Sequence, residues 1–130
     1  MSLMIIGVAV VGIINGYSMA AKRAEWSGYS LAAQALAIQQ IEQIRSARWD
    51  TQETPVIDNT TNVPLTSVAT MDIPIIGTNT IAATNYVSVT TIVVSVTPPV
   101  TMKMVRVDTV WPWFSQYFTN TIATFRAPDR

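Results

Sequence analysis

The sequence contains no cysteine and no histidine. Disulfide bonds, thiol nucleophiles, haem attachment and the usual zinc sites are therefore excluded. Only 12% of the 130 residues are charged, against the ~25% that is common in soluble domains. The formal net charge is zero. Because the sequence has no excess of positive charge, it gives no reason to expect a nucleic-acid partner.

Other residue types are missing from only one part of the chain. Residues 1–21 contain no charged side chain, no proline precedes Pro55, and no threonine occurs in the first 50 residues, whereas seventeen follow. Segments with such different chemistry are expected to form different structures. We therefore predict a boundary near Asp50, with a long helix over residues 1–49 and a β-rich head over residues 50–130.

The first segment has an apolar half and an amphipathic half. As a helix, residues 1–21 would span ~31 Å, the thickness of the hydrocarbon core of a bilayer. Over residues 22–49 the pattern continues at three- and four-residue steps, which predicts one apolar face. That face consists of Leu31, Ala35, Ile38, Ile41 and Ile44. A single helix of about 48 residues would be ~70 Å long, so its first half must be buried in something other than this chain.

Small residues recur every four positions along this helix, at Gly12, Gly16, Ala20, Ala24, Gly28 and Ala32. Such a ridge lets helix backbones approach closely. A plain membrane anchor is the alternative interpretation, but the ridge continues beyond the apolar tract. We therefore predict a helical assembly core. Its residues are Leu3, Ile6, Gly7, Val10, Gly12, Ile13, Gly16, Tyr17, Ala20 and Ala24.

The second segment carries strand signals. Residues 86–96 and 101–111 are rich in β-branched residues and flank Pro98-Pro99, which predicts a hairpin. Residues 118–126 form a further predicted strand, and residues 71–76 an edge strand interrupted by Pro74. The expected fold class is α+β: a long N-terminal helix with a small antiparallel sheet packed against its amphipathic half, in a lollipop shape.

No catalytic constellation is present, so we expect no enzyme, no cofactor and no small-molecule substrate. Asp50, Glu53 and Asp58 are oxygen donors in one loop, but we interpret them as solvated acids and expect no metal. Asn59 begins an Asn-Thr-Thr glycosylation sequon. The aromatic residues of 111–118 either form an adhesive loop or close one end of the sheet, and we favour burial.

The layout resembles a known family. The stretch from Gly16 to Gln34 (GYSMAAKRAEWSGYSLAAQ) and the closing FTNTIATFRAPD resemble type IV pilins and type II secretion pseudopilins. The likeness is to a branch of prepilin-type proteins from bacteria related to Verrucomicrobia. Prepilins carry a basic leader and then Phe-Thr-Leu-x-Glu, a pattern that the sequence does not contain. Processing by prepilin peptidase is therefore implied by the resemblance alone.

The resemblance implies a structural subunit of an extracellular filament. Such a subunit is held in the inner membrane before assembly and then forms a helical homo-oligomer at the cell surface. Two alternatives remain from the sequence. One is a minor pseudopilin of a type II secretion system, and the other is a single-pass anchored protein whose head binds a ligand outside the cell.

Overall fold

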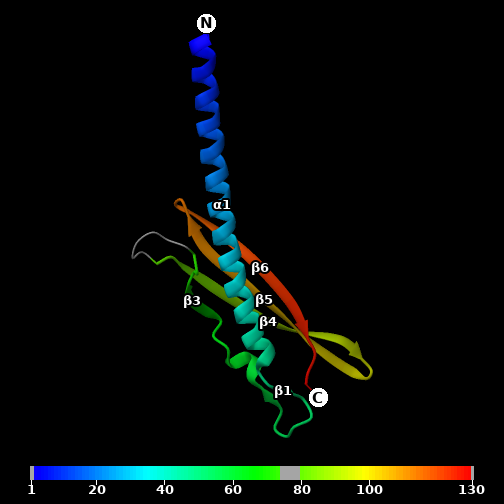
Figure 1. Cartoon of the computed structure of the whole chain (residues 1–130). Coiled ribbons are helices and arrows are strands. Elements are labelled where there is room, and N and C mark those ends of the chain that lie inside the picture. Colours follow the sequence, from blue (N-terminus) through cyan, green and yellow to red (C-terminus); the bar gives the residue numbers. More distant parts are fainter. Residues whose placement is uncertain (1, 74–79, 130) are drawn as a thin grey trace.

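The computed structural model describes residues 2–73 and 80–129, with side chains from residue 6 onward. One long helix is followed by antiparallel strands, so the fold belongs to the α+β class. Figure 1 shows the helix lying across the sheet while its N-terminal half extends beyond it. This arrangement leaves half of the helix without a partner from its own head.

Helix α1 runs from Ser2 to Ser46. Its 45 residues span ~68 Å, which confirms the predicted single long helix, although it ends at Ser46 and not at residue 49. The last carbonyls of a helix lack helical partners. Here Ser46 Oγ donates to the carbonyl of Gln43 at 2.9 Å, and Arg126 donates to the carbonyl of Ile44 at 2.7 Å.

Four antiparallel strands form the main sheet in the order β3-β4-β5-β6. Their bounds are Thr66–Thr70 for β3, Ala82–Val96 for β4, Pro99–Trp113 for β5 and Gln116–Arg126 for β6. A small second sheet pairs β1 (Trp49–Asp50) with β2 (Ile57–Asp58), and the 3-10 helix η1 (Asn59–Asn62) follows. The long strands β4 and β5 carry most of the sheet.

The predicted hairpin is confirmed. β4 begins four residues earlier than predicted, β5 is two residues longer at each end, and the turn is Thr97-Pro98 because Pro99 belongs to β5. The strand predicted at residues 118–126 begins at Gln116. The prediction of an edge strand at residues 71–76 is wrong for the part of this range that the structure describes. Residues 71–73 form no strand, residues 74–76 lie outside the described residues, and the edge strand is β3. Strand β3 could not be recognised from an alternation of large apolar residues, because its sequence is mainly polar and the residues at both of its ends are exposed.

The face of α1 that meets the sheet differs from the predicted one. Leu31 and Ile38 are 64% and 47% exposed, and Ala35 is exposed as well. Only Ile41 and Ile44 of the predicted face are buried, together with Ala33 and Ala37. The two alanines let the helix approach the sheet closely at their positions, while Ile41 and Ile44 pack on the strands and Leu31 and Ile38 face outward.

Two hydrophobic clusters hold the helix on the sheet. One joins Ala37, Ile41 and Ile44 of α1 to the valines Val87, Val105 and Val107 of β4 and β5. The other joins Ala33 to Met71, Ala83 and Trp111. Alternate residues of β5 point at the helix, so one face of the strand supplies both clusters. The core therefore covers the C-terminal part of α1 alone.

Candidate assembly surface

The N-terminal part of α1 is bare. Every side chain from Ile6 to Ser27 is exposed, and the apolar ones include Ile6 at 60%, Ile13 at 70% and Tyr17 at 80%. Burying a side chain of this kind is worth ~1.5–3 kcal/mol. A continuous exposed patch of this size marks an interaction surface.

The glycines of the small-residue ridge have no role in the packing of the subunit itself. A Cβ atom added at Gly7, Gly12, Gly16 or Gly28 would meet nothing within 4 Å. Glycine in a helix interior costs about 0.5–1 kcal/mol relative to alanine. The internal packing of the subunit therefore does not explain glycine at these positions. Close approach of another helix would explain it.

The residues predicted for the assembly core are placed as follows. Nine of them have described side chains, and all nine are exposed on α1: Ile6, Gly7, Val10, Gly12, Ile13, Gly16, Tyr17, Ala20 and Ala24. The side chain of Leu3 lies outside the described ones. The structure brings no other part of the described chain against these residues, so their predicted role depends on a partner.

The exposed apolar surface continues along the outer side of α1 past the point where the helix meets the sheet. Leu31 and Ile38 lie seven residues apart, two helical turns, and both point away from the head. They extend the bare tract toward the C-terminal end of the helix. The head therefore covers one side of this half and leaves an apolar stripe on the other.

Aromatic residues form the junction where the helix leaves the sheet. Trp111 is fully buried, and its ring centroid lies 5.1 Å from that of Phe118 and 6.0 Å from that of Trp26. The predicted burial of the aromatic cluster is therefore confirmed for Trp111. It is wrong for Phe114 and Tyr117, which are 64% and 78% exposed because they flank the turn between β5 and β6.

A polar bridge secures the same junction. Trp111 Nε1 donates to Asn120 Oδ1 at 2.8 Å, and Asn120 Nδ2 donates to the carbonyl and hydroxyl of Ser30 at 3.2 and 3.0 Å. Sequence analysis missed Asn120 and Trp26. The spacing of Trp26, Tyr29 and Ser30 places them on one helix face, and this pattern could have indicated the contact.

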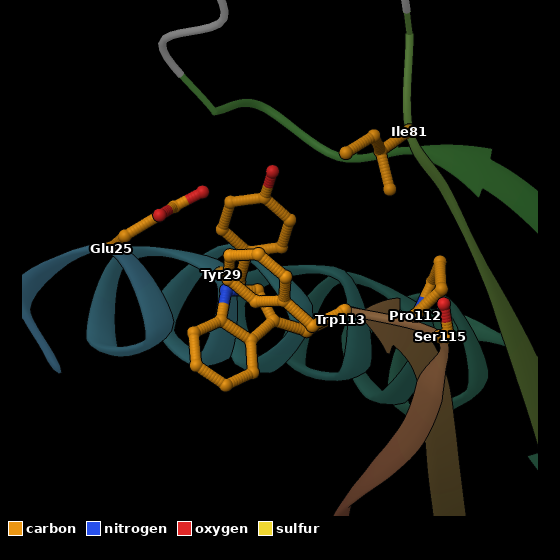
Figure 2. Close-up of a pocket in the computed structure, with 7 residues that line it drawn as sticks. Glu25, Tyr29, Ile81, Pro112, Trp113 and Ser115 are labelled. Carbon is orange, nitrogen blue, oxygen red and sulfur yellow. The ribbon is translucent and has the colours of Figure 1, made fainter. Parts of the chain in front are cut away.

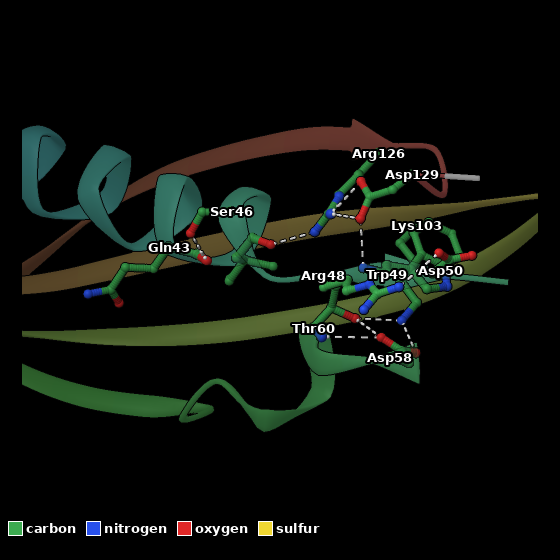
Figure 3. A network of polar contacts seen from close by, with 11 residues as sticks. Gln43, Ser46, Arg48, Trp49, Asp50, Asp58, Thr60, Lys103, Arg126 and Asp129 are labelled. Carbon is green, nitrogen blue, oxygen red and sulfur yellow. Dashed lines mark hydrogen bonds and ion pairs between the residues drawn. The ribbon is translucent and has the colours of Figure 1, made fainter. Parts of the chain in front are cut away.

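A second polar network fixes the other end of the helix, as Figure 3 shows. Arg126 donates to Ile44 of the helix and to Asp129, which accepts from the backbone N–H of Trp49 at 2.8 Å. The ammonium of Lys103 is buried. It pairs with Asp58 and lies 4.7 Å from the centre of the Trp49 ring. These contacts tie the helix end, the loop after it and two strands together.

The carboxylates of this network stay charged to low pH. Burial acts to raise the pKa of Asp58, but hydrogen bonds from Lys103 and Thr60 outweigh it and hold the pKa below its usual value. The Trp49 N–H, followed by Arg126, lowers the pKa of Asp129. The network is therefore an ion-paired clamp over the neutral range, and it links the end of α1 to β6 and to the segment that follows the helix.

The remaining predicted positions lie on the loop after the helix. Asn59 is exposed at the start of η1, and Thr61 of the sequon is exposed too, so both are open to modification. Asp50 and Glu53 pair with Arg48, at 3.3 and 2.9 Å, while Asp58 pairs with Lys103. Within the described residues no group of three potential ligands gathers to hold a metal ion.

Comparison with family models, with curated proteins and with solved structures finds no match to this chain. A search of the described residues for a helix both long enough and apolar enough to cross a membrane finds none. The candidate assembly surface is thus defined by its own residues: an exposed apolar tract and the small residues from Gly12 to Ala24, all of which are exposed. Ala32, the last residue of the ridge, packs against the head.

Proposed function

We propose that this protein is the structural subunit of an extracellular filament, in which the N-terminal halves of α1 from many copies pack together and the heads form the outer wall. One observation carries the proposal: every described side chain from Ile6 to Ser27 is exposed, although most of the first sixteen are apolar. An uncharged tract of this length requires a partner surface, and another copy of the same tract supplies one.

The gain from packing is large. Burying the uncharged tract would remove roughly 1,500 Å² of apolar surface per subunit, equivalent to tens of kcal/mol before entropy is subtracted. Side chains of one helix would fill the gaps of the next, and the glycines would allow close contact. The heads contribute little to this core because they leave the tract uncovered.

The family resemblance supports the same proposal and adds a location. A type IV pilin-like subunit is held in the inner membrane before assembly and lies at the cell surface afterwards, and we propose the same for this chain. This part of the proposal rests on the sequence, because residues 1–21 are uncharged and have the length of a bilayer-spanning helix. Filament assembly, and not catalysis, is the proposed activity.

The exposed outer stripe of Leu31 and Ile38 favours a filament over a single anchored protein with a ligand-binding head. A single anchor needs no apolar residues on the part of the helix that lies beside its own head. In a bundle of helices these residues meet neighbouring copies. A minor pseudopilin remains the second candidate, and the abundance of the protein in filaments separates it from a principal subunit.

The test compares the whole chain with a chain that lacks residues 1–21. Both are purified in mild detergent, the detergent is removed, and the products are examined by sedimentation and negative-stain electron microscopy. We expect long filaments from the whole chain and a soluble monomer from the shortened one. The same filament from the shortened chain would show that the helical core is wrong.

A further inference from the structure

The hairpin of β4 and β5 extends beyond the rest of the sheet. The last pairing of β6 joins Arg126 to Lys103, and β3 pairs no further than Tyr86. Residues 92–102, here called the arm, therefore form a two-stranded ribbon that no third strand flanks within the described residues. Figure 1 shows the arm projecting at the end of the head that is remote from the N-terminus.

The arm is apolar on both faces and carries no charge. Val93, Val94, Val96 and Val100 are 61%, 58%, 82% and 44% exposed. Thr97 and Pro98 form its exposed turn, and the exposed Pro99 follows as the first residue of β5. An isolated two-stranded hairpin is marginally stable in water, and exposed valines on both faces do not stabilise it there. The composition of the arm is that of a segment buried against a partner.

The opposite end of β5 holds an aromatic pocket. It is lined by Glu25, Tyr29, Ile81, Pro112, Trp113, Phe114 and Ser115 and has a volume of about 280 Å³. Figure 2 shows Trp113 beside Tyr29 of the helix, with Pro112 and Ser115 on the hairpin. Apart from Glu25 and Ser115, the walls are rings and aliphatic groups, so the pocket suits a small apolar segment.

The rim of the pocket has one unsatisfied polar group. Phe114 and Ser115, with φ angles of 43° and 60°, are the central residues of the hairpin turn between β5 and β6, and such two-residue turns need positive φ at both positions. The indole Nε1 of Trp113 is buried without a hydrogen-bond partner in the described chain. Trp111, by contrast, has its acceptor in Asn120. The Trp113 N–H is therefore a donor that an incoming acceptor could satisfy.

The tip of the arm has the chemistry that aromatic pockets recognise. Proline side chains are apolar and rigid, so they pack against aromatic rings at little cost in side-chain entropy. The two prolines also lack backbone N–H groups, so the turn offers carbonyl acceptors without competing donors. A modest rotation of the half-buried Trp113 would present its indole N–H to such a carbonyl.

The arm cannot reach the pocket of its own subunit. Pro99 begins β5 and Trp113 ends it, so the two sites lie ~46 Å apart along one strand. A shift of a second copy along the helix axis brings the arm of one copy toward the pocket of the other. A contact of this head-to-tail kind repeats indefinitely and generates a filament and not a closed dimer.

The size of the contact also points to a second copy. Within residues 96–100, Val96 and Val100 offer roughly 150 Å² of apolar side-chain surface, well below the ~800 Å² that each partner buries in a standard interface. The contact alone is too small for a stable dimer. It is large enough to add to an interface that the helices already form, and the uncharged arm meets no repulsion at the mouth of the pocket.

We propose that the arm tip, residues 96–100, of one subunit occupies the aromatic pocket of the next subunit and links the heads along the outer wall. The proposal rests on the filament function. It assigns a role to the arm that helix packing does not provide, because the arm lies at the far end of the head from the bare tract.

Cysteine cross-linking tests the contact directly, since the natural chain has no cysteine. Whole-chain filaments of the double variant Val96→Cys/Ser115→Cys are oxidised and run on a non-reducing gel. We expect a ladder of covalent dimers, trimers and higher species. Each single variant should give monomer, and filaments mixed from the two singles should give dimers only. Val96→Cys/Thr61→Cys, with its second cysteine on η1, is the matched control and should give no ladder.

The outcomes separate the two proposals. Absence of filaments from the unsubstituted chain would overturn the filament function and this contact with it. Filaments of the double variant without a ladder would overturn the contact alone. A free peptide of residues 94–102 that quenches the tryptophan fluorescence of the unsubstituted chain but not that of Trp113→Phe, without any ladder, would indicate an outside proline-rich partner and would also count against the contact. Trp113→Ala should raise the critical concentration for assembly roughly tenfold or more.

Discussion

Helix α1 packs against its own head from Trp26 to Ile44 and extends beyond it over residues 6–21, and the two parts use their residues in opposite ways. Beside the head, alanines face the sheet while Leu31 and Ile38 face outward. Beyond the head, all described side chains are outward, with glycines that nothing in the subunit touches. Small residues thus serve close packing in both halves, against a sheet in one and, as proposed, against another helix in the other.

The largest expected effect is a difference in the free energy of unfolding between two matched substitutions, one in each half of the helix. Ile44→Ala should lower the free energy of unfolding of the head by about 2–5 kcal/mol, because Ile44 is fully buried. Ile13→Ala should change it by less than about 0.5 kcal/mol, because its side chain touches nothing in the subunit. Thermal unfolding of both variants in mild detergent, followed by near-ultraviolet circular dichroism, makes the comparison. Equal losses would contradict it.

The next effect concerns the junction between the halves. Asn120→Ala removes the acceptor of the buried Trp111 Nε1 and the link to Ser30, so we expect a loss of about 1–3 kcal/mol. Asn62→Ala, on the exposed part of η1, is the control and should have little effect. Urea unfolding measured by tryptophan fluorescence distinguishes them. A neutral Asn120→Ala would mean that the bridge does not hold the helix.

The clamp at the covered end of the helix should respond to acid. The pKa of Asp58 is lowered in the folded chain, so its contribution to stability is present above the ordinary value of ~3.9. It is lost as pH falls through the lowered pKa, because the unfolded chain then binds more protons. Unfolding measured between pH 6 and pH 2 should show this decline. Asp58→Asn should make the decline shallower without removing it, because the pKa of Asp129 is lowered as well. Asp72→Asn, at an exposed acid, is the control variant.

The smallest effect on the stability of the subunit is expected from substitutions in the small-residue ridge. Gly16→Ala should stabilise the helix slightly, by less than about 1 kcal/mol, because the added Cβ meets open space. Gly16→Leu should leave the unfolding of the head unchanged but raise the critical concentration for assembly, since the larger side chain keeps neighbouring helices apart. Unchanged assembly of Gly16→Leu would favour a plain anchor.

Much of the fold could be predicted from the sequence because its signals are local. The absence of proline before Pro55 indicated the single helix, and the β-branched runs around Pro98-Pro99 indicated the hairpin. Which face of helix α1 packs against the sheet could not be predicted. Leu31 and Ala33 both fit a helical repeat, and which of them faces the sheet depends on how closely the strands approach.

The candidate site was predictable in part for the same reason. An uncharged tract with regular glycines is visible in the sequence, but its exposure depends on where the head ends. The arm and the aromatic pocket were not predicted as a pair. Pro99 and Trp113 lie at opposite ends of one strand, and only the lengths of the neighbouring strands show that one end is bare and the other enclosed.

A helical reconstruction of the assembled filament by electron cryo-microscopy tests the central claim most directly. The account predicts a central bundle in which residues 6–20 of each copy contact the same residues of other copies, with the heads outside. A filament held together by its heads alone, or a subunit with these residues folded back on its own sheet, would contradict it.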